Sequence, residues 1–255
     1  IRNTTPQLNS VIEQDFTVYK RTYAPAPWTP PSHLSLFTGL YPSQAMKQPN
    51  TVKLDPVFKT LPELFKDSGF KTFAASANAL ISRTNGFDRG VDTFLQLWLP
   101  DPAKDETPLA FEGNNRYEKL NNLFGRFLSK ETRMDVSMGV REFIHKKFRD
   151  VLKDATPSTD MAMKMTKRYL IENRDKRVFC FLNLMQVHNR YNPPHATRNT
   201  FVKYNAAFER YYDKTPQVSH YAVEPYPADL IEYIKLKYEE EVLYLDIAIS
   251  NLITF

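Results

Sequence analysis

The sequence predicts an α/β fold, in which helices on both sides of a mostly parallel sheet form three layers (α/β/α), with a helical insertion. Two observations predict these layers. Residues 60–76 have the pattern of a helix, a glycine and a short buried strand in direct succession, an order typical of α/β folds. The run "RVFCFLNLMQV", at 177–187, is so continuously apolar that it predicts a central strand buried on both faces. A chain of 255 residues is long enough to bury a core of this size.

The first forty residues are expected to form a helix, a strand and a second helix. Thr5 as the N-cap and Pro6 at the first helical position predict a short helix. Residues 16–23, "FTVYKRTY", alternate in part and are rich in β-branched and aromatic side chains, which predicts a strand. The segment 32–39, "SHLSLFTG", has the pattern of a helix that Gly39 ends.

A third helix and a buried strand follow. Thr60 is expected to cap this helix and Gly69 to end it, with Leu61, Leu64 and Phe65 facing inward. The strand starts directly after the glycine. Farther along the chain, the glycines of "NGFDRGVD" predict a structural turn.

The second half of the chain is expected to hold the insertion and two long helices. Residues 100–160 are polar and mostly helical in pattern, which predicts a helical insertion. A helix is expected over 159–175, before the apolar strand. The last helix, 228–253, is expected to bury one stripe of side chains: Ile231, Ile234, Tyr238, Val242, Leu245, Ile249 and Leu252.

Composition limits the classes of partner. The formal charge is +5, but lysines and arginines are spread along the chain, so a solvated surface is favoured over nucleic-acid binding. Cys180 is the only cysteine and is expected to be a buried, inert thiol, which excludes an intrachain disulfide and a cysteine metal cluster. No apolar stretch has the length of a membrane-spanning helix. The chain starts at Ile1 without a methionine, and we expect it to be a fragment.

The prolines before the second helix draw attention to one hydroxyl. Pro30 and Pro31 suit the first turn of a helix, so Thr29 is expected at the N-cap or just before it. Helix N-termini offer backbone N–H groups and a partial positive charge, which can hold the oxygens of phosphate or sulfate. A metal-bound hydroxyl there can act as a nucleophile, and His33 would face it from one turn along. The alternative is an ordinary N-cap threonine with a solvent-facing histidine.

Four stretches in a fixed order resemble the sulfatases of the alkaline phosphatase superfamily. "TPPSHLSLFTGLYPSQ" is similar to their signature of Cys or Ser, x-Pro-Ser-Arg, an apolar run, Thr-Gly and Tyr-Pro, and "TPQLNSVIEQDF" fits the family's opening helix. The other three stretches are 60–94 with "GFDRGVD", 181–194 ("FLNLMQVHNRYNPP") and 238–252 ("YEEEVLYLDIAISNL"). The resemblance covers nearly the whole chain outside the insertion. It implies a partial N-terminal catalytic domain over 1–255.

The resemblance implies a metal-dependent hydrolase or transferase that acts on an anionic sulfate or phosphate ester. Thr29 occupies the position of the nucleophile, which also contacts a divalent metal (Ca, Mg, Mn or Zn). No formylglycine is expected at Thr29, because a threonine would leave a ketone rather than an aldehyde. Unmodified threonine is the nucleophile of related phosphodiesterases, so the fold points to sulfatases while Thr29 favours phosphate esters. Ser32, inside the same signature, is expected to bind substrate.

Three further residues are implied by position. His33 replaces the arginine that orients the family's nucleophile, and it can donate a hydrogen bond but not the bidentate fork of arginine. Asn78 stands where a lysine and a histidine are usual and would contact an ester oxygen or, alternatively, cap a turn. His188 matches the histidine that serves the leaving group.

The chain also departs from the family's pattern. The other metal ligands are expected outside this chain, before its start and beyond its end. The missing carboxylates, and the lysine and histidine lost near Asn78, leave an alternative open: a non-catalytic relative that keeps the fold to bind an anion or a partner. The sequence does not predict an oligomeric state.

Overall fold

The computed structural model describes residues 2–46, 53–99, 155–188, 190–214 and 226–255. Its elements, all within one compact unit of the chain, are the helices α1 (Pro6–Asp15), α2 (Thr29–Thr38), α3 (Pro42–Ala45), α4 (Leu61–Asp67), α7 (Ala155–Glu172), α8 (Ala206–Lys214) and α9 (Ala228–Ile253), the 3-10 turn η1 (Arg83–Asn85), and the strands β1 (Lys71–Ser76), β2 (Thr93–Gln96) and β3 (Val178–Asn183). The expected insertion falls almost wholly on 100–154, outside the described residues. Its last residues, 155–160, form the start of α7.

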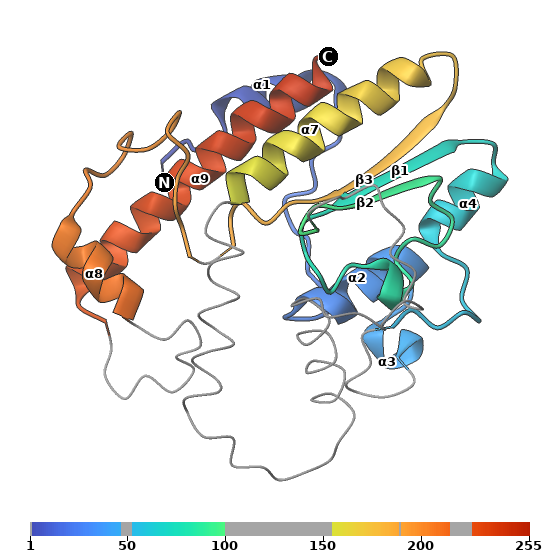
Figure 1. Cartoon of the computed structure of the whole chain (residues 1–255), viewed down its shortest axis with the longest axis horizontal. Coiled ribbons are helices and arrows are strands. Elements are labelled where there is room, and N and C mark those ends of the chain that lie inside the picture. Colours follow the sequence, from blue (N-terminus) through green and yellow to red (C-terminus); the bar gives the residue numbers. More distant parts are fainter. Residues whose placement is uncertain (1, 47–52, 100–154, 189, 215–225) are drawn as a thin grey trace, which may run out of the picture. The chain divides into compact units, whose positions relative to one another are not determined.

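The described strands form a parallel sheet in the order β2-β1-β3, with helices on both faces, so the predicted α/β fold class is confirmed (Figure 1). Ala74 of β1 pairs with Phe94 on one side and Phe181 on the other. The expectation that 177–187 forms the central strand is wrong within this sheet, because β1 is central and β3 lies beside it with half-buried side chains. The small residues of β1 explain its position, since Ala74 and Ala75 let helices approach closely on both faces.

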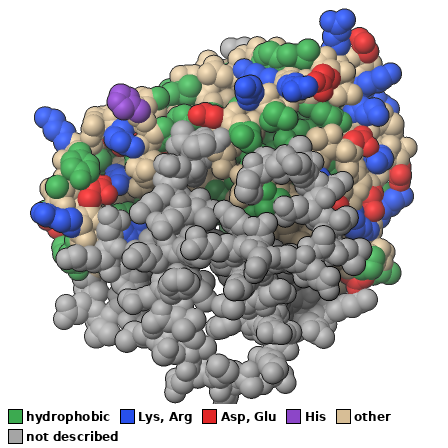
Figure 2. Space-filling view, in the orientation of Figure 1, with side chains coloured by type: hydrophobic (Ala, Val, Ile, Leu, Met, Phe, Trp, Pro, Cys, Tyr) green, Lys and Arg blue, Asp and Glu red, His purple; other side chains and the backbone are tan. Residues whose placement is uncertain are grey.

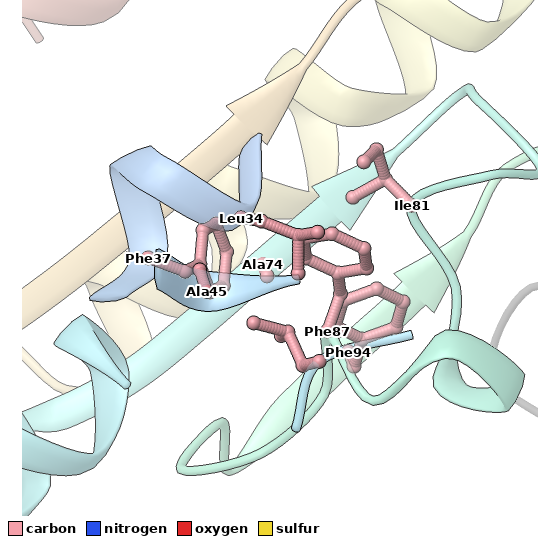
Figure 3. Close-up of a cluster of buried hydrophobic side chains, with 8 residues drawn as sticks. Leu34, Phe37, Ala45, Ala74, Ile81, Phe87 and Phe94 are labelled. Carbon is pink, nitrogen blue, oxygen red and sulfur yellow. The ribbon is translucent and has the colours of Figure 1, made fainter. Parts of the chain in front are cut away.

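One face of the sheet packs against α2 and α3. Ala74 joins a buried cluster that includes Leu34 and Phe37 of α2 and Phe87 from the turn after β1 (Figure 3). The rings of Phe37 and Phe87 meet edge to face with centroids 5.2 Å apart, a favourable aromatic geometry. This cluster fixes α2 against the sheet and so fixes where its first residue lies.

The opposite face packs against α7. Phe73 and Ala75, the neighbours of Ala74 along β1, point to this side with Ala162 of α7, as the alternation of a strand requires. Cys180 packs against this cluster too, half-buried rather than buried as expected. Burial raises the pKa of its thiol to about 11, so the thiol is protonated near neutral pH, as expected for an inert cysteine. Helix α9 runs along α7 and α1, so α7 lies between α9 and the sheet (Figure 1).

The expected helices outside the insertion form, and several of them end at the predicted residues. The helix expected over 159–175 is α7, which runs from Ala155 to Glu172. Thr60 caps α4 in a capping box, accepting from the backbone N–H of Glu63 at 3.4 Å while the Glu63 carboxylate accepts from the Thr60 N–H at 2.7 Å. Gly39 ends α2 and Gly69 follows α4, both in the left-handed region. Thr5 is at the N-cap of α1, but its side chain does not cap the helix.

Two expectations about the first half of the chain are wrong. Residues 16–23 form no strand, and Tyr19 and Tyr23 are 80% and 87% exposed. An alternating pattern needs a partner strand to become one, and none of the described strands pairs with this segment. Leu64 of α4 is half exposed rather than inward.

The stripe expected on α9 is also wrong, although the bounds of the helix are as predicted. Ile231 is 49% exposed. The buried side chains are instead Leu230, Tyr233, Lys237, Glu240, Glu241, Tyr244, Asp246 and Ser250. Polar side chains occupy the buried face because they hydrogen-bond to other segments there, so tertiary contacts and not hydropathy choose the face.

The turn at 85–92 packs against the start of α4. Gly90 has φ of +77°, and a Cβ on it would lie 2.3 Å from the backbone nitrogen of Glu63. Arg89 beside it donates to both carboxylate oxygens of Glu63 and to the carbonyl of Phe58. The glycine is therefore required both by its backbone angle and by the close approach of α4.

Acidic and basic side chains are interspersed over the described residues on the face shown in Figure 2. Among the helices that the structure describes, none has the length and apolar character of a membrane span.

Candidate functional site

Helix α2 begins at Thr29. The sequence predicted Thr29 at the N-cap or just before it, whereas in the structure it is the first residue inside the helix. Trp28 is the N-cap, in extended conformation, and Thr29 is the first helical residue. Pro30 and Pro31 follow, and the N–H of Ser32 already bonds to the carbonyl of Trp28 at 3.4 Å. Because prolines have no N–H, Thr29 supplies the one backbone donor of the first three helical positions. This helix start therefore offers an anion fewer backbone N–H groups than the sequence analysis expected.

The start of α2 lies at the carboxyl edge of the sheet. His33 joins the two: its Nδ1 lies 2.9 Å from the carbonyl oxygen of Thr29, and its Nε2 lies 3.1 Å from Nδ2 of Asn183. Asn183 is the last residue of β3, and it pairs in register with Ser76, the last residue of β1. Carboxyl ends of parallel strands are the usual place for ligand sites in open α/β sheets.

The His33 imidazole sits in an apolar setting. The rings of Phe87 and Phe181 meet it edge to face at 6.4 and 6.0 Å between centroids. Burial lowers the pKa of His33, and the hydrogen bond to Thr29 opposes this only in part. Burial therefore favours the neutral form of the imidazole.

Asn78 follows β1 at the same edge. Its Oδ1 accepts from the N–H of Leu80 at 2.9 Å, which is the turn-capping alternative stated for it above. Ser76 Oγ donates to the Asn78 carbonyl at 3.1 Å and accepts from the Asn78 N–H at 3.2 Å. The oxygen of the amide thus belongs to the turn, and only its NH₂ group is suited to an ester oxygen.

The two remaining expected residues, Ser32 and His188, are close in sequence to Thr29 and Asn183 respectively. Ser32 is half-buried in the first turn of α2. His188 is exposed, in a turn closed by its own N–H on the carbonyl of Met185, five residues beyond Asn183. The roles of Ser32 at the substrate and of His188 at the leaving group stay predictions.

The described residues around Thr29 do not fit a divalent metal. The side chains linked to it are imidazole, amide and hydroxyl groups, whereas Mg²⁺ and Ca²⁺ prefer carboxylate oxygens. A zinc site needs three or four histidine, cysteine or carboxylate ligands, and among the linked side chains His33 alone is of this kind. Within the part of the chain that the structure describes, no three His, Cys, Asp or Glu side chains come together to hold a metal ion. Metal dependence therefore stays a prediction.

Sequence reasoning missed Asn183 and Ser76. The signal was present, because both are polar residues at the ends of otherwise apolar strand patterns. Strand order was needed to use it, since only adjacent parallel strands bring their last residues together.

A second polar cluster lies along α9, apart from Thr29. Glu241 Oε1 accepts from the N–H of Asn192 at 2.5 Å, and Glu240 Oε1 accepts from Phe201 and Val202 at 2.8 and 3.1 Å. Burial raises the pKa of Glu241 to about 8. A cavity of about 80 Å³ opens here, lined in part by Asn192, Arg198, Tyr204, Glu209, Lys237 and Glu240. The carboxylates of this cluster hold the loop between β3 and α8 against α9.

Comparison with models of protein families gives a match over almost the whole chain. The family model described as Sulfatase covers residues 1–254. No curated protein matches the chain. A match over almost every residue, on a parallel sheet with helices on both faces, bears out the resemblance of the ordered sequence motifs: the chain belongs to the sulfatase family of hydrolases.

Proposed function

We propose that this protein cleaves or transfers a sulfate or phosphate ester with Thr29 as the nucleophile. The observation that carries the proposal is the position of Thr29 at the first residue of α2, tied through His33 to the carboxyl edge of the sheet. Thr29 Oγ1 gives up its proton to water and forms a bond to sulfur or phosphorus, while the bond from that atom to the alcohol oxygen breaks. His188 gives a proton to the departing alkoxide oxygen. It takes a proton back from the water or second alcohol that then releases the group from Thr29.

The surrounding residues steady this hydroxyl rather than move its proton. His33 donates to the carbonyl of Thr29 and holds the first turn of α2. The N–H of Thr29, the NH₂ group of Asn78 and the hydroxyl of Ser32 are the proposed donors to the ester oxygens. A divalent metal would lower the pKa of the hydroxyl. Because the described side chains do not supply its ligands, metal dependence is a separate prediction.

The test is turnover of an aryl sulfate and an aryl phosphodiester by the complete protein. Thr29→Ala is expected to lower kcat by at least about 1,000-fold, since removing a nucleophile disables the covalent route. Thr29→Ser keeps the hydroxyl and is expected to retain measurable turnover. Thr84→Ala, at an exposed threonine of η1, is the matched control and should leave kcat unchanged. Equal turnover in wild type and Thr29→Ala would show that Thr29 is not the nucleophile.

Metal dependence is checked in the same assay. Turnover should be lost in a chelator and restored by Mg²⁺, Mn²⁺, Ca²⁺ or Zn²⁺. Turnover that persists in the chelator would remove the metal from the proposal and leave Thr29 to be judged on its own variants.

The second candidate is a non-catalytic relative that binds an anion or a partner. It is favoured by the side chains linked to Thr29, which are neutral groups without a carboxylate among the described residues. Absence of turnover on both ester classes, together with calorimetric binding of sulfate or phosphate that Thr29→Ala weakens, would favour this candidate.

A further inference from the structure

We propose that Asn183 is a positioning residue of this site: its side-chain amide fixes the His33 ring in one tautomer, and His33 in turn fixes the first turn of α2. As a contribution to catalysis, this inference rests on the function proposed for Thr29. As a statement about hydrogen bonds, it stands on its own.

The two partners of His33 determine which ring nitrogen carries the proton. The carbonyl oxygen of Thr29 can only accept, so Nδ1 must donate to it across 2.9 Å. The Nδ2 group of Asn183 can only donate, so Nε2 must accept across 3.1 Å. The ring is therefore the Nδ1–H tautomer, and both of its nitrogens are in use.

The orientation of the Asn183 amide follows from its contact with His33. Ser76 Oγ lies 3.5 Å from Asn183 Oδ1 but gives its one proton to the Asn78 carbonyl at 3.1 Å, so it does not by itself fix the amide. With the amide reversed, Oδ1 would face Nε2 while the Thr29 carbonyl faces Nδ1, and a neutral ring has one proton for two acceptors. With Nδ2 toward Nε2, the single ring proton goes to the Thr29 carbonyl and both nitrogens of His33 are satisfied.

Packing restricts the ring as well. The edge-to-face contacts with Phe87 and Phe181 cover the imidazole from two elements. Phe181 lies two residues before Asn183 on β3, so one strand supplies both a ring contact and the hydrogen-bond donor. A rotation of the ring would break both hydrogen bonds and both contacts.

The consequence concerns the role of His33. A ring held at both nitrogens acts on the site through the Thr29 carbonyl and not as a carrier of protons. Asn183 thus stabilises Thr29 from the sheet, through a chain of two hydrogen bonds. This assigns a role to the last residue of β3 and makes His33 a link between sheet and helix.

The first experiment needs no variant. Nitrogen NMR of ¹⁵N-labelled protein at pH 7.5 should show a protonated Nδ1 and an unprotonated Nε2 for His33. It should also show a coupling through the hydrogen bond between Nε2 and the Asn183 amide nitrogen. A protonated Nε2, or no coupling to Asn183, would overturn the proposal without any reference to turnover.

The second experiment is a double-mutant cycle on kcat. Asn183→Leu keeps the size of the side chain but cannot donate, and it is expected to lower kcat by roughly 10- to 100-fold with little change in KM. In a His33→Ala background the same change should cost less than about 2-fold, because the two residues act as a unit. Asn251→Leu, at an exposed position of α9, is the matched control and should leave kcat unchanged. Equal losses in both backgrounds would show that Asn183 does not act through His33.

The two experiments separate this inference from the proposed function. If Thr29→Ala leaves turnover unchanged while the NMR coupling is present, the nucleophile is wrong and the hydrogen-bonded link remains. If the coupling is absent while Thr29→Ala abolishes turnover, the nucleophile stands and the link is wrong.

Discussion

At the scale of single residues, buried polar groups in this molecule are defined by their partners. His33 has a lowered pKa because it is desolvated, and its hydrogen bonds use both ring nitrogens. Glu241 shows the opposite direction, because burial disfavours its charged form and raises its pKa. In both cases burial disfavours the charged form of the side chain. It therefore lowers the pKa of a base such as His33 and raises the pKa of an acid such as Glu241.

Glu241 makes stability depend on pH. Its pKa is about 8 in the folded state against 4.5 ordinarily, so the folded state binds more protons between these values. Stability from this group is therefore full below pH 4.5 and is lost as pH rises through 8. Between pH 6 and 9 we expect wild type to lose on the order of 2 kcal/mol of unfolding free energy through Glu241. Urea denaturation at the two pH values measures this loss.

Glu241→Gln should show a flatter dependence on pH, since an amide oxygen still accepts from Asn192 and does not ionise. Glu232→Gln, at an exposed residue paired with Lys235, should keep the slope of wild type. The same slope in Glu241→Gln as in wild type would refute the assignment.

At the scale of elements, residues at the helix ends determine where α2 and α4 begin. Helix α2 starts with prolines that leave Thr29 as a lone backbone donor, and α4 starts with a capping box joined to the 85–92 turn through Arg89. The sequence predicted both helix starts, because caps and prolines act locally. It did not predict the contact of the turn with α4, which joins residues 26 or more positions apart.

The glycines at two turns should respond differently to alanine. Gly39 and Gly90 have φ of +72° and +77°, so alanine is strained at either position by about 1–2 kcal/mol. At Gly39 nothing lies within 4 Å of the added Cβ, whereas at Gly90 it meets the backbone of Glu63 at 2.3 Å. Gly90→Ala should therefore lower the unfolding free energy at least twice as much as Gly39→Ala. Equal losses in chemical denaturation would contradict the close approach of α4.

At the scale of the whole molecule, α9 connects segments from across the chain. Asp246, which is 1% exposed, accepts from the N–H groups of Gln7 and Leu8 at 3.0 and 2.6 Å. It thereby caps α1 in place of Thr5, whose side chain makes no capping bond. The first and last described helices are held together by this carboxylate.

Removing this carboxylate should be costly. Asp246→Ala leaves the partly buried N–H groups of Gln7 and Leu8 without this acceptor and is expected to cost roughly 1–3 kcal/mol of unfolding free energy. Asp246→Asn keeps one acceptor and should cost less. Asp67→Ala, which breaks an exposed pair with Lys59, is the control and should cost less than about 1 kcal/mol. A loss in Asp246→Ala no larger than in this control, measured by urea denaturation, would show that Asp246 does not stabilise the start of α1.

The sequence by itself determined the α/β class, helix ends such as Thr60 and Gly39, and the ordered motifs of the sulfatase family, because turn residues, helix ends and apolar runs act over a few positions. The tertiary structure alone decided that β1 is central, that residues 16–23 stay outside the sheet, that α9 buries carboxylates, and that Asn183 meets His33. Each of these depends on which distant segments become neighbours. A polar side chain is buried where it can form a hydrogen bond with a partner, and only the folded chain brings that partner within hydrogen-bond distance.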